Sequence, residues 1–139
     1  MNRKHSYRPA RTERGANLVE AALALLLTLT ILFGIMEFGR AAWSYNTVAH
    51  AAREGARFAM VHGKTSKAPA TQADVQAVVQ RQAIGLLPAN TQVVVTWIPN
   101  NLPGSAVKVA VTYNFSSIVP WVSSSVMSLK GTSQMVILN

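Results

Sequence analysis

The chain has 139 residues, of which 50% are hydrophobic and only 13% are charged, and it contains no cysteine. The low charge fraction favours a membrane-linked chain over an ordinary soluble domain, and the missing cysteines exclude disulfides, thiolate metal sites and a cysteine nucleophile. Half of the formal net charge of +8 lies in residues 1–15, and the other half is spread thinly over the rest of the chain. Because no basic cluster with interleaved aromatic residues remains elsewhere, nucleic acid is not expected as a partner.

The N-terminal segment 1–14 is polar, basic and without periodicity, so we expect no regular structure there. Pro9 further disfavours a helix. Five basic residues precede the apolar run that follows, whereas Arg40 and Arg53 are the first two after it. The positive-inside rule therefore predicts a cytoplasmic N-terminus and an extracytoplasmic C-terminal part.

The next element is predicted to be an apolar helix that crosses a bilayer. A hydrocarbon core of ~30 Å needs ~20 apolar residues, and segment 16–36 supplies that length with Glu20 as its only charged residue. Three interpretations compete: a Sec-type signal peptide, an unprocessed single-span anchor, and a class III, pilin-type signal. The Sec-type signal is disfavoured because the apolar run exceeds the usual ~7–15 residues and the A-x-A site at Ala49–Ala51 lies far beyond its end.

Glu20 favours the pilin-type interpretation. A carboxylate at mid-membrane costs on the order of 2.5–3.5 kcal/mol on insertion scales, and a simple anchor gains nothing from it. A prepilin peptidase recognises a glycine, a carboxylate at the fifth position after it, and an apolar run that follows. Here Gly15 is followed by Ala16, by Glu20 at that fifth position, and by the apolar run. Cleavage after Gly15 would create an α-amine at Ala16, which Glu20 of a neighbouring subunit could neutralise. Segment 1–15 would then be a cleaved leader. The alternative is that Glu20 lies near the head groups and is tolerated.

Helical periodicity continues beyond the apolar run to Gly63, which we expect to end the helix. We divide this helix into a transmembrane part, 16–37, and an extracytoplasmic part, 38–63. Apolar positions in the second part recur every three to four residues, and we expect this stripe to face a core. Its members are Phe38, Ala41, Ala42, Tyr45, Val48, Ala49, Ala52, Ala56 and Ala59.

A second stripe on the same helix consists of small residues spaced by four: Thr47, Ala51, Gly55 and Ala59. Such spacing allows another helix to approach closely. The same residues could instead lie beneath the chain's own C-terminal sheet, and both interpretations remain open.

Segment 64–139 is predicted to form a small α/β head after a linker that ends at Ala70. Thr71 is predicted to be the N-cap of a short helix, with Asp74 in its first turn. Alternating apolar residues predict three strands, and the Pro- and Asn-rich turn between the first two predicts a hairpin. The strands are Thr91–Ile98, Ser105–Phe115 and Leu129–Leu138. The fold class is therefore α+β: a long N-terminal helix with a short helix and a small antiparallel sheet.

No catalytic motif is present. His50 and Glu54 are spaced by four on a helix, but two candidate ligands without a third are poor evidence for zinc. We expect no catalytic residues, metal or cofactor, and a non-enzymatic protein. Two spaced pairs, Glu37 with Arg40 and Glu54 with Arg57, are expected to contribute only ~0.2–0.5 kcal/mol each.

The N-terminal half resembles the TadE-like family, minor pilin-like proteins of the tight-adherence (Tad, or Flp pilus) apparatus. The resemblance lies in a glycine–glutamate start, a G-x-x-[DE]-x-G-R turn and an A-A-R-E-G-A-R segment. Matching positions are Gly15 and Glu20, then Gly34, Glu37, Gly39 and Arg40, then Ala51 to Arg57 with Arg53 and Glu54. The C-terminal half matches only in pattern, and many relatives have a proline where this chain has Leu26.

The resemblance implies a pilin-like architecture in the bacterial inner membrane, with the head in the periplasm. It also implies a prepilin peptidase, other pilin-like subunits and the Tad/Flp assembly machinery as partners. Two function classes follow. The first is a minor pilin or pseudopilin-like subunit in Tad/Flp pilus assembly, with a type II secretion pseudopilin as the nearest rival. The second is a membrane-tethered periplasmic binding module that never enters a fibre. The mature N-terminus distinguishes the classes, because only the first needs a free amine at Ala16.

Overall fold

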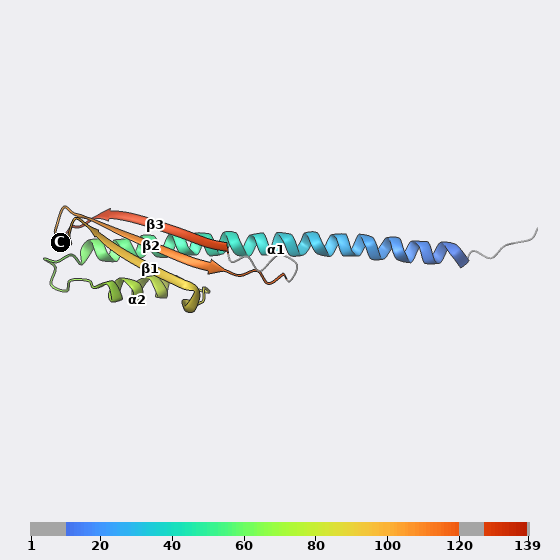
Figure 1. Ribbon diagram of the computed structural model, residues 1–139, viewed down its shortest axis with the longest axis horizontal. Helices are drawn as coiled ribbons and strands as arrows, with labels where there is room; N and C mark the ends of the chain where they lie inside the picture. Colours follow the sequence, from blue (N-terminus) through green and yellow to red (C-terminus); the bar gives the residue numbers. More distant parts are fainter. Residues whose placement is uncertain (1–10, 120–126, 139) are drawn as a thin grey trace, which may run out of the picture. The chain divides into compact units, whose positions relative to one another are not determined.

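The structure is a computed structural model that describes residues 11–119 and 127–138. The expectations for residues 1–10 lie outside this range. The chain divides into two compact units, Met1–Met36 and Glu37–Asn139, each of which is described by itself. The elements follow in the order α1 (Arg11–Val61), α2 (Gln72–Gln82), the 3₁₀ helix η1 (Pro88–Asn90), β1 (Thr91–Ile98), β2 (Ala106–Phe115) and β3 (Met127–Val136) (Figure 1).

The described part of the first unit is helical and has no core of its own. Residues 15–36 are all exposed, including Leu18 at 72% and Leu26 at 63%. The two threonines of the apolar run satisfy their hydroxyls within the helix: Thr28 donates to the carbonyl of Ala24 and Thr30 to that of Leu26, each at 2.8 Å. Side-chain hydroxyls bonded in this way carry little desolvation cost in hydrocarbon. The helix is long and apolar enough to cross a membrane, judged by length and composition.

The second unit, which we call the head, is a two-layer α/β arrangement. Its antiparallel sheet has the order β1-β2-β3. The residues of α1 that follow Glu37 and the residues of α2 pack on one face of this sheet. The side chains of Val75 and Val79 on α2 and of Val109 on β2 all surround Gly55 of α1. The strands run along this part of α1 (Figure 1).

The inner face of the sheet supplies most of the core. Every second residue of β2 is buried, from Val107 to Phe115, and Val107, Val109 and Val111 are fully buried. Burying a side chain of this size stabilises a fold by ~1.5–3 kcal/mol relative to leaving it exposed. The intervening residues, such as Lys108, are exposed or half-buried. The predicted alternation of the central strand is therefore confirmed.

A capping box begins α2, as the sequence predicted. The backbone N–H of Thr71 donates to the Asp74 carboxylate at 2.9 Å, and the N–H of Asp74 donates to Thr71 Oγ1 at 3.3 Å. The hydrogen bond from the Thr71 side chain, followed by that from its backbone, lowers the pKa of Asp74 below its ordinary value. Both orphan donors at this helix end are thus satisfied locally.

Several predicted boundaries move. The strand Thr91–Ile98 is confirmed as predicted, whereas β3 runs from Met127 to Val136 instead of Leu129 to Leu138. Only the ends of the strand differ: Lys130, Thr132 and Gln134 are exposed, so the side chains of β3 alternate between the two faces as predicted. At its start α1 reaches Arg11, within the segment expected to lack regular structure, since no proline or glycine lies between Pro9 and Arg14. It ends at Val61, before Gly63.

Gly131 of β3 is where the sheet comes closest to α1. A Cβ placed on Gly131 would lie 2.8 Å from the Cα of Ala49 and 2.9 Å from the carbonyl oxygen of Val48. These are backbone atoms of a helix, which cannot yield as the end of a flexible side chain can. Isolated glycines within strands often mark such close backbone approaches. Only glycine fits here without moving β3 or α1.

We predict that Gly131→Ala destabilises the head by ~1–3 kcal/mol, because the added methyl group overpacks a contact between two backbones. The measurement is the urea midpoint of the detergent-solubilised full chain, followed by tryptophan fluorescence. Thr132→Ala is the matched control, since Thr132 is the next residue and is exposed. Equal midpoints for the two variants would contradict the close approach.

Candidate functional site

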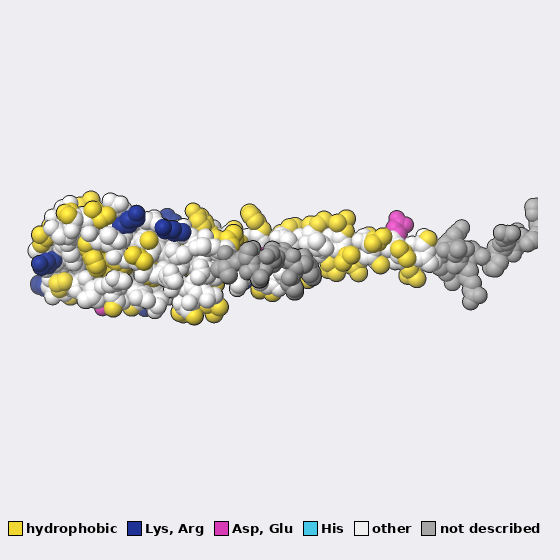
Figure 2. All heavy atoms as spheres, in the orientation of Figure 1, with side chains coloured by type: hydrophobic (Ala, Val, Ile, Leu, Met, Phe, Trp, Pro, Cys, Tyr) yellow, Lys and Arg dark blue, Asp and Glu magenta, His cyan; other side chains and the backbone are white. Residues whose placement is uncertain are grey.

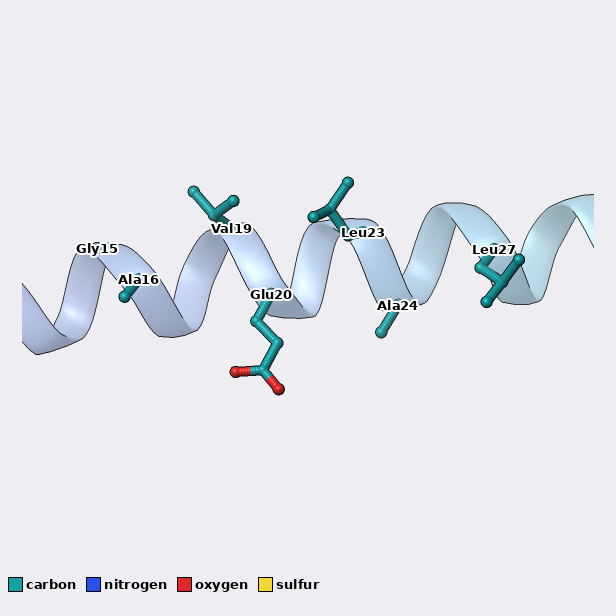
Figure 3. Close-up of a pocket in the computed structure, with 7 residues that line it drawn as sticks. All are labelled: Gly15, Ala16, Val19, Glu20, Leu23, Ala24 and Leu27. Atoms are coloured by element: carbon teal, nitrogen blue, oxygen red, sulfur yellow. The ribbon is translucent and has the colours of Figure 1, made fainter.

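The segment that carries Gly15, Ala16 and Glu20 is a regular turn-and-a-half of α1. Figure 3 shows the Glu20 carboxylate extending away from the helix, on the side on which Ala16 and Ala24 also lie. These three positions are spaced by four, so they share one face of the helix. Val19 and Leu23 extend from the opposite side in the same view. The predicted processing residues are therefore brought together on an exposed, mostly apolar helix.

The chain's own packing gives no reason for a glycine at position 15. A Cβ added to Gly15 would meet no atom within 4 Å, and its φ is not positive. A glycine within a helix costs ~1 kcal/mol relative to alanine. Neither space nor backbone conformation offsets that cost within the described chain. A requirement for glycine at this position would have to come from another molecule.

The Glu20 carboxylate is likewise without a partner among the described side chains. Among the residues whose side chains the structure describes, it forms no hydrogen bond and no ion pair, and it is surrounded along the helix by exposed apolar side chains. Charged groups within membrane helices are usually paired with another charge or line a functional site. The Glu20 carboxylate is therefore an exposed charge on an otherwise apolar part of α1.

A second group of residues lies where the head begins. Arg40 donates from Nη1 to Glu37 Oε2 at 2.7 Å, so the predicted i,i+3 pair is present. The side chain of Glu37 is only 12% exposed, which is more burial than a surface ion pair has. Its neighbours Gly34 and Gly39 are exposed, with open space where a Cβ would lie.

Glu37 also binds a segment distant in the sequence. The backbone N–H of Ile118 donates to Glu37 Oε1 at 3.2 Å, across a separation of 81 residues. The guanidinium of Arg40 lies 5.0 Å from the centroid of the Phe115 ring, a cation–π geometry. Both oxygens of Glu37 are therefore used, and together with Arg40 it fastens the end of β2 to α1. We call Glu37, Arg40, Phe115 and Ile118 the junction cluster.

The stripe of small residues is occupied by the chain itself. Ala51 and Ala59 are fully buried, and Gly55 is buried against α2 and β2. A Cβ on Gly55 would lie 2.6 Å from Cγ2 of Val79. Thr47 is half-buried and donates to the carbonyl of Trp43. The alternative of a partner helix on this stripe is therefore wrong for its three buried members, because α2 and the sheet already take that place.

The charged positions of the segment 51–57 lie on the outside of α1. Arg53 and Arg57 are exposed and Glu54 is half-buried. Arg53 donates from Nε to the carbonyl of Ala49 at 3.2 Å. Within residues 11–119 and 127–138, Glu54 and Arg57 form no ion pair, so that predicted pair is absent. His50 is exposed, and the described residues contain no group of three metal-ligating side chains around it.

Three features of the site could not be predicted from the sequence: the bond from Ile118 to Glu37, the stacking of Arg40 on Phe115, and the placement of Trp43. The Trp43 ring covers Gly85, where a Cβ would lie 2.5 Å from Cη2, and the positive φ of Gly85 (77°) also favours glycine. The sequence offered two weak signals for these features: the spacing of Glu37 and Arg40, and the presence of a glycine at position 85.

Comparison with known proteins bears on this segment directly. Residues 15–57 match the model of the family described as TadE-like protein. This match confirms the resemblance drawn from the sequence, and it begins at Gly15 and ends at Arg57. No match was found among curated proteins or among solved structures. The family match and the apolar helix together support association with a membrane and with a Tad-type pilus system.

We predict that Glu37→Ala accelerates amide hydrogen exchange of Ile118 at least about tenfold, since a hydrogen bond to a charged group contributes ~1.5–3 kcal/mol. The amide of Val109, in the middle of the sheet, should keep its protection. Glu54→Ala is the matched control, because it removes a glutamate of the same helix that forms no ion pair. Unchanged exchange at Ile118 in the Glu37 variant would show that the junction cluster does not hold this segment.

Proposed function

We propose that this chain is a non-enzymatic, minor pilin-like subunit that is processed by a prepilin peptidase and acts in assembly of a Tad/Flp type pilus. The observation that carries this proposal is the arrangement of Gly15, Ala16 and Glu20 at the start of an apolar helix that matches the TadE-like family. The family match supports a role without catalysis. The head is then the extracytoplasmic part of the subunit.

Processing accounts for the glycine that the chain's own packing does not explain. A prepilin peptidase requires a small residue before the scissile bond, and Gly15 is surrounded by open space. The Gly15–Ala16 bond lies within α1, close to the end at which α1 begins. Helix ends fray readily, so the bond can become accessible without unfolding the rest of the helix. The five basic residues of the leader favour a cytoplasmic location for this end.

Assembly accounts for the Glu20 carboxylate, which has no partner among the described side chains. Cleavage after Gly15 places a new α-amine at Ala16, and Glu20 of a neighbouring subunit is the group that can neutralise it. Ala16 and Glu20 are four residues apart, so both lie on the same face of α1. Within a low-dielectric bundle of helices such a pair is strongly favoured over either charge alone. The Glu20 face of α1 is then the contact between subunits.

The first test concerns processing. Gly15→Leu should leave the leader attached, because the bulky side chain blocks the peptidase, while Gly34→Leu should be processed normally. Mass spectrometry of the chain purified from cells that contain the peptidase gives the mature N-terminus. The wild-type protein should begin at Ala16. Any other mature start would refute the pilin-type signal and would favour a tethered binding module.

The second test concerns Glu20 alone. We predict that Glu20→Ala is inserted and cleaved but does not co-purify with other pilin-like subunits, since an uncompensated buried charge costs ~3–5 kcal/mol. If Glu20 served only insertion, its removal would lower the membrane cost and leave assembly intact. Glu54→Ala should assemble as the wild type does. Normal assembly of the Glu20 variant would remove the proposed pairing with the Ala16 amine.

A further inference from the structure

Large apolar side chains, six of which form the surface considered next, are exposed at the end of the head where Glu37 lies. We call these six the apolar rim: Phe38, Trp43, Tyr45, Ile84, Leu87 and Ile118. The sequence placed Phe38 and Tyr45 in the stripe that faces the core, but they are 77% and 51% exposed. The sheet extends along α1 only as far as Phe115, which contacts Arg40. Within residues 11–119 and 127–138, no strand continues along α1 beyond this level.

Contacts within the head bring these residues to one end, although they come from three segments. The Trp43 ring covers Gly85, the residue after Ile84. The hydroxyl of Thr91 donates to the carbonyl of Leu87 at 3.0 Å, and Thr91 is paired with Tyr113 near the end of β2. The junction cluster fixes Ile118 beside Glu37. Figure 2 shows hydrophobic side chains gathered over the segment between α2 and β1.

The opposite end of the head differs in chemistry. Its exposed apolar residues are aliphatic, among them Leu102 and Leu138, and the nearby loop carries Lys64 and Lys67. None of the described aromatic residues exposed in the head, which are Phe38, Trp43 and Tyr45, lies there. Aromatic side chains with an apolar body are enriched at the interface between membrane and water. The distribution of exposed aromatic residues therefore indicates that the Glu37 end of the head lies at the membrane–water interface and that the opposite end lies in water.

The position of the apolar rim in the chain fits this chemistry. Glu37 directly follows the charge-free run that ends at Met36. Six residues of helix place the Cα of Trp43 ~9 Å beyond that point, and its side chain leans back toward the helix N-terminus. The interfacial layer outside the hydrocarbon core is roughly 5–8 Å thick on each side. The rim thus lies within reach of the head-group layer of the membrane that the chain's own helix would cross.

We propose that the apolar rim binds the surface of the phospholipid bilayer, so that the head is held against the membrane at a second point besides the apolar helix. Ile118 enters the interfacial layer because Glu37 holds its backbone, and Ile84 and Leu87 enter from the segment after α2. Arg40, which is 37% exposed in its side chain, lies at the same level and can meet lipid phosphates. The inference rests on the membrane span of the proposed function.

The test uses the full chain in vesicles of phosphatidylcholine and phosphatidylglycerol that contain lipids brominated near the head-group end of the acyl chain. Since the chain has no cysteine, Ile84→Cys, Ile118→Cys and Leu138→Cys each allow attachment of one fluorophore. Leu138 is the matched control, with an exposed fraction of 62% against 64% for Ile118. We expect brominated lipid to cause a loss of emission at positions 84 and 118 and none at 138. Adding Glu37→Ala should restore emission at 118 but not at 84.

Emission that is unchanged at all three positions in vesicle-bound protein would overturn the inference. A second result would also overturn it. In that case the labels at 84 and 118 are shielded from aqueous iodide but are not quenched by brominated lipid, and the shielding is lost when the protein is diluted in the membrane. That result would assign the apolar rim to a second copy of the chain. Flotation with the vesicles is measured first. A chain that does not float refutes the membrane span as well, whereas a floating chain with unquenched labels refutes the inference alone.

Discussion

Close packing against α1 between Val48 and Ala59 is the constraint on which the head depends. Here the side chains of α1 are small, and the sheet and α2 come near its backbone: β3 at Gly131, and the valines of β2 and α2 around Gly55. With no cysteine in the chain, the head must be held by such packing and by its hydrogen bonds. Small side chains bury little area of their own. They stabilise the head because they let the valines of β2 and α2 pack close to the backbone of α1.

The glycines of α1 fall into two groups: one that the packing of the head requires, and three that it does not require. Gly55 is enclosed by the chain's own side chains, so its size is explained by the fold. Gly15, Gly34 and Gly39 are in open space and have ordinary helical backbone. Each weakens the helix, and no packing contact or backbone conformation in the described chain requires a glycine there. Residues that cost stability and gain nothing in their own fold are expected at functional sites. The open glycines all lie in the segment that matches the TadE-like family.

Local patterns predicted much of the fold. The alternation in β2, the turn before Gly104 and the cap at Thr71 each depend on residues within a few positions of one another, and each is found in the structure. The interactions that decide the shape of the head are distant in sequence. Periodicity marks Phe38 and Tyr45 as one face of a helix, but it cannot tell where the covering sheet stops.

The candidate site shows the same division. The positions of Gly15 and Glu20 follow from linear spacing, and the Glu37–Arg40 pair follows from helical spacing. The capture of Ile118 by Glu37 could not be predicted, because one partner is a backbone N–H that any residue would supply. The same holds for the small stripe: its spacing predicts a close neighbour, but the identity of that neighbour depends on where α2 folds back.

The arrangement of β3 beside α1 has a mechanical consequence. Along α1, Arg40 contacts the end of β2, Ala49 meets Gly131, and the carbonyl of Met60 accepts a hydrogen bond from Leu138. These attachments follow one another in the direction of the helix axis, with the strands lying lengthwise beside it (Figure 1). Tension applied along α1 would therefore load them in shear, as several contacts acting in parallel, and would not peel them apart one by one. This loading geometry resists separation of the sheet from α1 better than a peeling geometry would.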